Sequence, residues 1–225
     1  MQLSVKDLSK LLNVAERTIY RWIKQKSIPF YRIHDQYRFN RIEILDWVTA
    51  QKINISQNIF HDADENDIAE FSLTETIKKG GIYYRVEGKD KKSLLGSVID
   101  LLSLPDDVKK EDLLNAMLVR EELGSTGLGD GIAIPHARYP VVVHIPYAIV
   151  SICFLEKPID YDAIDGKPVN CLFTLVSPTV RSHLKMLSRI AYVLKNTDVK
   201  EILVRQKSRE VILSEIEKAE QFLNK

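Results

Sequence analysis

"LLNAMLVREELGSTGLGDGIAIPHAR", residues 113–138, combines three features that decide the fold of the larger part of the chain. It begins with apolar residues at helical spacing, continues with a glycine-rich stretch, and ends in a short apolar run that leads through Pro135 to His136. The question for function is which chemistry needs a histidine held at the end of such a run.

The segments around this stretch alternate between helix and strand patterns. Periodicity over 90–103 and 109–122 predicts two helices, and apolar runs predict strands over Val141–Val143, Ala148–Phe154 and Val169–Val176. We expect an α/β domain over residues 71–225, with its strands covered by helices. The residues expected to be buried on the two helices are Leu94, Leu95, Val98, Leu101 and Leu102, then Leu113, Leu114, Met117 and Leu118.

The glycines do not belong to a nucleotide-binding motif. No GK[ST] follows them, a GxGxxG in strand–helix context is absent, and "DGKP" at 165–168 fails the same test. A flexible loop can instead offer backbone N–H groups to an anion. The four glycines of the loop are Gly124, Gly127, Gly129 and Gly131.

His136 is a candidate for nucleophilic attack on phosphorus. Imidazole is largely neutral at physiological pH and then has one ring nitrogen with a lone pair. The oxygens of a transferring phosphoryl group need fixed donors nearby, and Arg120 and His183 are candidates for that role. From the residues alone, His136 can also be an ordinary loop histidine, and the other two can be surface residues.

Residues 3–29, "LSVKDLSKLLNVAERTIYRWIKQKSIP", read as two short helices with a tight joint. Ser4 with Asp7 predicts the first helix start, and "FYRIHDQYRFN" (30–40) predicts two strands around a turn. Asn40 is the expected N-cap of a third helix, matched by Glu43. The expected core residues are Val5, Leu8, Leu11, Leu12, Ile19, Trp22, Ile23, Ile44, Leu45, Trp47 and Val48.

A helix, turn, helix, small wing and helix form the layout of a DNA-binding module whose second helix enters the major groove. The residues that we expect to face DNA are Arg17, Thr18, Tyr20, Arg21, Lys24 and Arg38. The alternatives are a solvated helix face or a module that binds protein. One such unit binds weakly, so we expect a homodimer.

The uneven distribution of charge along the chain predicts the domain boundaries. The whole chain has 225 residues and a net charge of +1, but residues 1–55 are basic and "HDADENDIAE" (61–70) is acidic. We expect a winged helix-turn-helix domain at 1–55, a linker at 56–70 and the α/β domain thereafter.

Cysteine usage and hydropathy limit the remaining function classes. Cys153 and Cys171 lack metal-site spacing and lie in apolar runs, which predicts buried thiols, and no sequence pattern points to a metal or a cofactor. Without a signal peptide or a membrane-length apolar run, we expect a cytoplasmic protein with no membrane partner.

Two families resemble parts of the chain. Residues 1–50 resemble the excisionase/MerR-type helix-turn-helix family through the stretches quoted above. Residues 71–222 resemble the enzyme IIA domain of the sugar phosphotransferase system, of the fructose, mannitol and nitrogen-regulatory class. The matching stretches are residues 113–138, "IDYDAIDGKPVNCLFTLVSP" (159–178) and "HLKMLSRIAYVL" (183–194).

The second resemblance implies a mixed sheet flanked by helices and a specific chemistry. It implies that His136 accepts a phosphoryl group from the small histidine phosphocarrier protein, and that Arg120 and His183 assist. His34, His61 and His144 match nothing in the family and are interpreted as wing, linker and strand residues.

The chain shows neither a IIB-like cysteine domain nor a membrane IIC part, a feature shared with the nitrogen-regulatory branch. We expect a regulator that couples phosphorylation of His136 to binding of DNA or of a regulated protein. The alternatives are a phosphoryl-shuttle component whose head serves assembly, and a DNA-binding regulator whose IIA domain is not phosphorylated.

Overall fold

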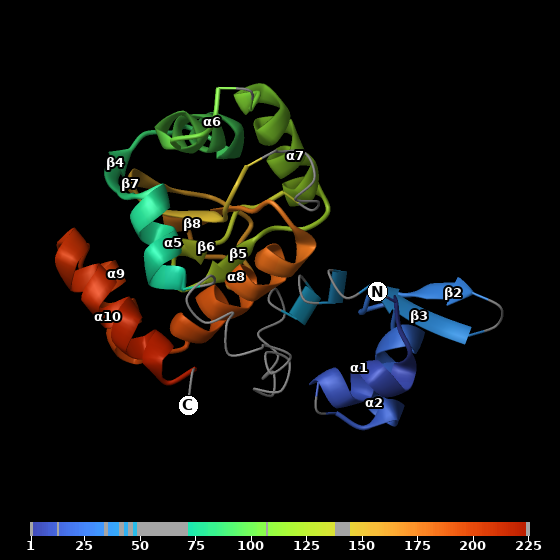
Figure 1. Ribbon diagram of the computed structural model, residues 1–225. Helices are drawn as coiled ribbons and strands as arrows, with labels where there is room; N and C mark the ends of the chain where they lie inside the picture. Colours follow the sequence, from blue (N-terminus) through green and yellow to red (C-terminus); the bar gives the residue numbers. More distant parts are fainter. Residues whose placement is uncertain are drawn as a thin grey trace. The chain divides into compact units, whose positions relative to one another are not determined.

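The computed structural model describes residues 2–12, 14–33, 36–40, 43–44, 47–48, 72–106, 108–137 and 145–223. The chain forms two compact units, Met1–Asp64 and Glu65–Lys225 (Figure 1). The division falls within the acidic stretch, while the predicted linker at 56–70 lies outside the described residues.

In its described residues, the N-terminal unit contains the helices α1 and α2, a further short helical segment and a small antiparallel sheet. Its elements are β1 (Gln2–Leu3), α1 (Val5–Leu12), α2 (Glu16–Lys24), β2 (Tyr31–Ile33) and β3 (Gln36–Asn40), with the strands in the order β1-β3-β2. Helix α1 starts as predicted, because the Ser4 hydroxyl accepts from the Asp7 N–H and the Asp7 carboxylate accepts from the Ser4 N–H. The Ser4 hydroxyl also donates to the Asp7 carboxylate at 2.7 Å, and this bond, together with that from the Ser4 N–H, holds the pKa of Asp7 below its ordinary value.

The core of this unit confirms most of the predicted apolar face. Leu11 and Trp22 are only half-buried, and Trp22 meets Trp47 edge to face with ring centroids 5.1 Å apart. The described part of the third segment is helical at Glu43, Ile44, Trp47 and Val48, whereas Leu45 and the predicted cap at the Asn40 side chain lie outside the described residues. The buried apolar residues are Leu3, Val5, Leu8, Leu12, Ile19, Ile23, Ile28, Phe39, Ile44 and Val48.

The C-terminal unit is built on a five-stranded mixed sheet in the order β4-β7-β8-β6-β5. Strands β4 and β7 are parallel, as are β6 and β8, while the other two pairs are antiparallel. The strands are β4 (Ile82–Val86), β5 (Gly127–Gly129), β6 (Ile132–Ala133), β7 (Ile149–Ile159) and β8 (Val169–Val176).

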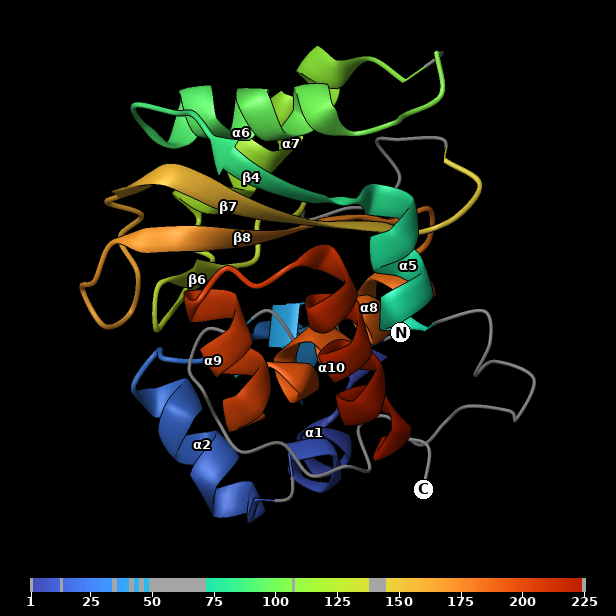
Figure 2. The same cartoon turned by 90° about the vertical axis from the view of Figure 1, so that its left-hand side faces the viewer.

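Helices cover both faces of this sheet. In Figure 2, α6 and α7 lie above the strands, and α5, α8, α9 and α10 lie on the opposite face. The helices are α5 (Leu73–Gly80), α6 (Lys91–Leu101), α7 (Lys110–Glu122), α8 (Val180–Val193), α9 (Thr197–Val204) and α10 (Arg209–Gln221). Because both faces are covered, β7 and β8 are apolar along most of their length rather than alternating.

The structure corrects several details of the predicted elements. Strand β8 has the predicted bounds, but the predicted strand Ala148–Phe154 starts at Ile149 and runs on to Ile159, and Val141–Val143 lies outside the described residues. Leu101 was expected to be buried and is 39% exposed, because it is the last residue of α6 and lines an open pocket beside Tyr83 of β4. Leu114 and Leu118 are half-buried.

Both cysteines are buried free thiols, as predicted. They lie on the adjacent strands β7 and β8 but pack into cores on opposite faces of the sheet, Cys171 with α8 and Cys153 with α6. Burial raises the pKa of Cys153 to about 12 and that of Cys171 well above its ordinary value, so both thiols stay protonated.

Candidate functional site

His136 extends the line of β6 along the end of β8. It forms a parallel bridge with Leu175, and the Leu175 N–H donates to the Pro135 carbonyl at 3.0 Å. Ile134 and Ile132, two and four residues earlier, pack into the core on the α8 side of the sheet. Because side chains alternate along an extended segment, His136 is directed to that same face.

The tautomer of His136 follows from one hydrogen bond. Its Nδ1 lies 2.7 Å from the Ile134 carbonyl oxygen, which can only accept, so Nδ1 carries the proton. In the neutral ring the lone pair therefore lies on Nε2. The side chain is 4% exposed, so the ring is held in place by its surroundings.

His183 reaches the same place from the start of α8. Thr179 caps this helix, since its hydroxyl accepts from the Ser182 N–H at 3.1 Å and Ser182 completes a capping box. The imidazole is 1% exposed, and its Nδ1 lies 3.0 Å from the Ser177 hydroxyl. The predicted position of His183 at a helix start is confirmed.

The two histidine rings lie next to each other in a tilted arrangement, with centroids 5.2 Å apart and an angle of 57° between their planes. They meet because β6 lies beside β8 in the sheet and α8 follows β8 after a short turn. The first turn of a helix has a partial positive charge, which favours an anion near His183. The pair can present a lone pair and a second ring to an electrophile with negative oxygens.

Arg120 lies in the last turn of α7, as predicted, and is 8% exposed. Its Nη1 donates to the Gly124 carbonyl oxygen at 2.9 Å, so the guanidinium holds the start of the glycine-rich stretch. A direct role of Arg120 beside the two histidines stays a prediction.

The glycine-rich stretch is a tight hairpin of β5 and β6 rather than an open loop. A Cβ at Gly127 would lie 2.7 Å from the Ala163 Cβ, so glycine is required here by close packing. Several of its N–H groups already donate within the protein, from Thr126 to Glu121 and from Asp130 to Asp165. Close packing therefore accounts for Gly127, and binding of an anion by the backbone of this stretch stays a prediction.

A polar cluster that runs from the buried Glu121 to the exposed Asp162 lies beside this hairpin and was missed by sequence reasoning. Glu121 accepts from Thr126, and Lys91 lies between Glu121 and Asp162, with its Nζ 2.6 Å from the Asp162 carboxylate. Burial raises the pKa of Tyr161, which packs beneath Lys91 with its ring centroid 5.0 Å from Nζ. In the sequence, this cluster is signalled only by Glu121, the acidic residue directly after Arg120.

The N-terminal unit has a basic helix face. On α2, Arg17, Tyr20, Arg21 and Lys24 are exposed and Thr18 is half-buried. Tyr20 packs edge-on against Tyr37 of β3, with centroids 6.1 Å apart.

The wing residue Arg38 is half-buried on β3 and donates to the Tyr37 carbonyl and the Gln36 side chain. These contacts hold its guanidinium against the strand. The contact of Tyr20 with Tyr37 on the same strand joins the wing to α2, the helix that carries the other predicted DNA-facing residues.

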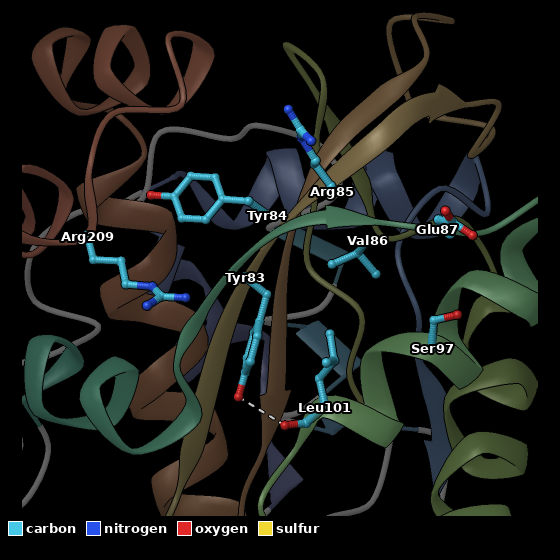
Figure 3. A pocket seen from close by; sticks show the side chains of 8 residues that line it. All are labelled: Tyr83, Tyr84, Arg85, Val86, Glu87, Ser97, Leu101 and Arg209. Atoms are coloured by element: carbon cyan, nitrogen blue, oxygen red, sulfur yellow. Dashed lines mark hydrogen bonds between the residues drawn. The ribbon is translucent and has the colours of Figure 1, made fainter.

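A separate pocket of about 390 Å³ lies at the outer edge of β4 (Figure 3). In the close-up, the Tyr83 hydroxyl donates to the Leu101 carbonyl at 2.9 Å. The pocket contains neither histidine and plays no part in the site above. Its lining residues are Tyr83, Tyr84, Arg85, Val86, Glu87, Ser97, Leu101 and Arg209.

Some predicted residues cannot be placed. His34, His61 and His144 lie outside the described residues. Within the described ranges no group of three or more His, Cys, Asp or Glu side chains could hold a metal ion. None of the helices in that part of the chain is long and apolar enough to cross a lipid bilayer.

Comparison with known proteins identifies the class of both units. Residues 75–219 match the family "Phosphoenolpyruvate-dependent sugar phosphotransferase system, EIIA 2", and the chain belongs to this family. Residues 3–52 match a family described as a helix-turn-helix domain. Both resemblances predicted from the sequence are confirmed.

Several relatives that are similar to the C-terminal unit are named nitrogen regulatory proteins. A nitrogen regulatory protein of Pseudomonas aeruginosa is 36% identical over 135 residues, which cover 58% of this chain and 85% of the relative. One from Escherichia coli K12 is 36% identical over 132 residues, covering 56% of this chain and 77% of its own length. The crystal structure of nitrogen regulatory protein IIA-Ntr from Neisseria meningitidis matches with a TM-score of 0.57 and 32% identity, over 64% of this chain and 98% of that one.

Proposed function

We propose that this protein is a phosphoryl-responsive regulator in which His136 accepts a phosphoryl group from the histidine phosphocarrier protein. The observation that carries the proposal is the buried histidine pair, in which the Nδ1–H of His136 is bound to the Ile134 carbonyl. The family membership of residues 75–219 and the similarity to nitrogen regulatory proteins support the same chemistry.

The proposed transfer forms one bond to phosphorus and breaks another. The Nε2 lone pair of His136 attacks phosphorus while the bond from phosphorus to the donor's imidazole nitrogen breaks, and the donor ring leaves as a neutral base. The phosphorylated ring keeps its proton on Nδ1 and gains positive charge, which the Ile134 carbonyl oxygen stabilises at 2.7 Å.

In this proposal His183 stabilises the phosphoryl oxygens. The proposal assigns the Ser177 hydroxyl, which lies 3.0 Å from Nδ1 of His183, as the donor in this contact, so that the ring proton is on Nε2, where it can donate to the incoming group. The partial charge at the start of α8 acts in the same direction. Arg120 supports the site through the glycine-rich stretch that it binds.

The N-terminal unit supplies the output by binding duplex DNA or a regulated protein. Arg17, Arg21 and Lys24 of α2 are exposed and can pair with phosphates, and Arg38 is held on the wing. Thr18 and Tyr20 lie near the helix start, from which side chains reach base edges. Because one unit of this size binds weakly, the proposal includes a homodimer on DNA.

Transfer is tested by incubating the purified protein with the phosphocarrier system and radiolabelled phosphoenolpyruvate. The wild-type protein and His144→Ala should take up acid-labile, base-stable label, and His136→Ala should take up none. Label that survives on the His136 variant would contradict the assignment.

The output is tested by DNA affinity at matched salt, before and after phosphorylation, with His136→Ala treated identically. Couplings between sites are typically about 1–3 kcal/mol, so a change of several-fold to about 100-fold is expected. Replacing Arg21 and Lys24 by alanine should reduce the slope of log affinity against log salt by about 2. If DNA affinity is absent at low salt, the unit binds a protein instead.

A further inference from the structure

The carboxylate of Glu121 is buried at the end of α7, with its side chain 5% exposed. It accepts three hydrogen bonds from one residue: the Thr126 N–H lies 3.1 and 3.2 Å from its two oxygens, and the Thr126 hydroxyl lies at 2.7 Å. Lys91 Nζ lies 3.4 Å from the carboxylate. A buried carboxylate is tolerated only with such partners, so Thr126 is held firmly.

Two further hydrogen bonds connect Thr126 to the reacting histidine. The Ile134 N–H donates to the Thr126 carbonyl at 3.0 Å, and the Ile134 carbonyl accepts from Nδ1 of His136 at 2.7 Å. Glu121 and His136 are therefore the two ends of one continuous set of contacts through Thr126 and Ile134.

We propose that Glu121 is a positioning residue for phosphoryl transfer, an inference that rests on the function proposed above. By fixing Thr126, it fixes the Ile134 carbonyl, which in turn keeps the proton of His136 on Nδ1 and the lone pair on Nε2. When this support is lost, the ring samples the other tautomer, in which Nε2 carries the proton and cannot attack phosphorus.

The chain offers a matched control in Glu220 on α10. This second buried carboxylate has the same kind of partners, since it accepts from the N–H groups of Leu73 and Thr74 and from Arg189 Nη1 at 2.7 Å. It joins the start of α5 to α8 and α10, and its partners include none of the residues that connect Glu121 to His136. If the substitutions act only by lowering stability, changes at Glu121 and at Glu220 should reduce phosphoryl transfer alike. If Glu121 positions His136, only the change at Glu121 should reduce it.

The experiment compares full-length wild-type protein with Glu121→Gln, Glu220→Gln and Thr126→Val. Two quantities are measured: the rate of phosphoryl transfer from the phosphorylated phosphocarrier protein, and the ring ¹⁵N signals of His136 in the unphosphorylated protein. A small displacement of a reacting group costs up to about 100-fold in rate, so Glu121→Gln should transfer about 10- to 100-fold more slowly. Its ¹⁵N signals should shift towards a mixture of tautomers.

Thr126→Val removes only the hydroxyl donor from a residue of nearly the same shape, so a smaller loss of the same kind is expected. If Glu121→Gln does not fold, the transfer rate and the ¹⁵N signals of Thr126→Val test the positioning role instead. Glu220→Gln should keep the wild-type transfer rate and ¹⁵N signals, even if its unfolding temperature falls by as much as that of Glu121→Gln.

Unchanged ¹⁵N signals in both Glu121→Gln and Thr126→Val would overturn the positioning role, as would equal rate losses in Glu121→Gln and Glu220→Gln. The ¹⁵N measurement needs no phosphoryl donor. If wild-type protein takes up no label, the proposed function fails, while the tautomer comparison still decides whether Glu121 positions His136.

Discussion

Replacing Gly127 by alanine tests whether the hairpin that leads to His136 is held by close packing. The new Cβ would lie 2.7 Å from the Ala163 Cβ and 2.8 Å from its Cα, where carbon atoms normally approach to about 3.5–4.0 Å. The neighbouring backbone has little freedom to retreat, because the Ile164 N–H donates to the Gly127 carbonyl at 3.2 Å. Overpacking of this kind costs about 1–3 kcal/mol.

The expected result is a lower unfolding temperature for the C-terminal unit. A unit of this size loses roughly 2–4 °C per kcal/mol, so calorimetry should show a fall of about 2–12 °C. Trp22 and Trp47 both lie in the N-terminal unit, so tryptophan fluorescence identifies the transition of that unit, which should not move.

Gly96→Ala is the matched control. Gly96 lies inside α6, where a Cβ would meet only Leu114 Cδ2 at 4.0 Å. Alanine is preferred over glycine in a helix by about 1 kcal/mol, so this variant should unfold at a higher temperature. A Gly127→Ala protein as stable as wild type would refute the packing argument, because nothing would then have resisted the added methyl group.

Two further predictions concern charged groups. Arg189→Met leaves the Glu220 carboxylate buried without its cation and should lower the stability of the C-terminal unit by about 3 kcal/mol in a urea titration; a loss below 1 kcal/mol would contradict a buried ion pair at this position. The pKa of Asp7 is lowered in the folded state, so its contribution to stability is present above the ordinary carboxyl pKa of about 3.9 and is lost as the pH falls further. Tryptophan fluorescence should therefore show that acid unfolding of the N-terminal unit is less steep in Asp7→Asn, and identical curves would remove the role of the Ser4–Asp7 pair.

The sequence predicted the parts of the fold that have strong local signals. The start of α1 at Ser4, the exposed face of α2 and the bounds of β8 each follow from a cap, a helical period or an apolar run. The short strands β5 and β6 could not be predicted, because two or three residues are too few to show a period.

The candidate site was predictable as a set of residues but not as an arrangement. His136 and His183 are 47 positions apart, and they meet only because β6 pairs with β8, a pairing that no local pattern encodes. Glu121 was missed because its role depends on burial and on the bonds of Thr126, which are properties of the folded chain. The family resemblance supplied what the local patterns could not.

The most direct test of the account is to determine which nitrogen of which histidine carries the phosphoryl group. The measurement is ³¹P and ¹⁵N NMR of the protein after transfer from the phosphorylated phosphocarrier protein. The account predicts a phosphorus–nitrogen bond at Nε2 of His136, with the proton retained on Nδ1 opposite the Ile134 carbonyl. A phosphoryl group on Nδ1 of His136, or on any other residue, would contradict it.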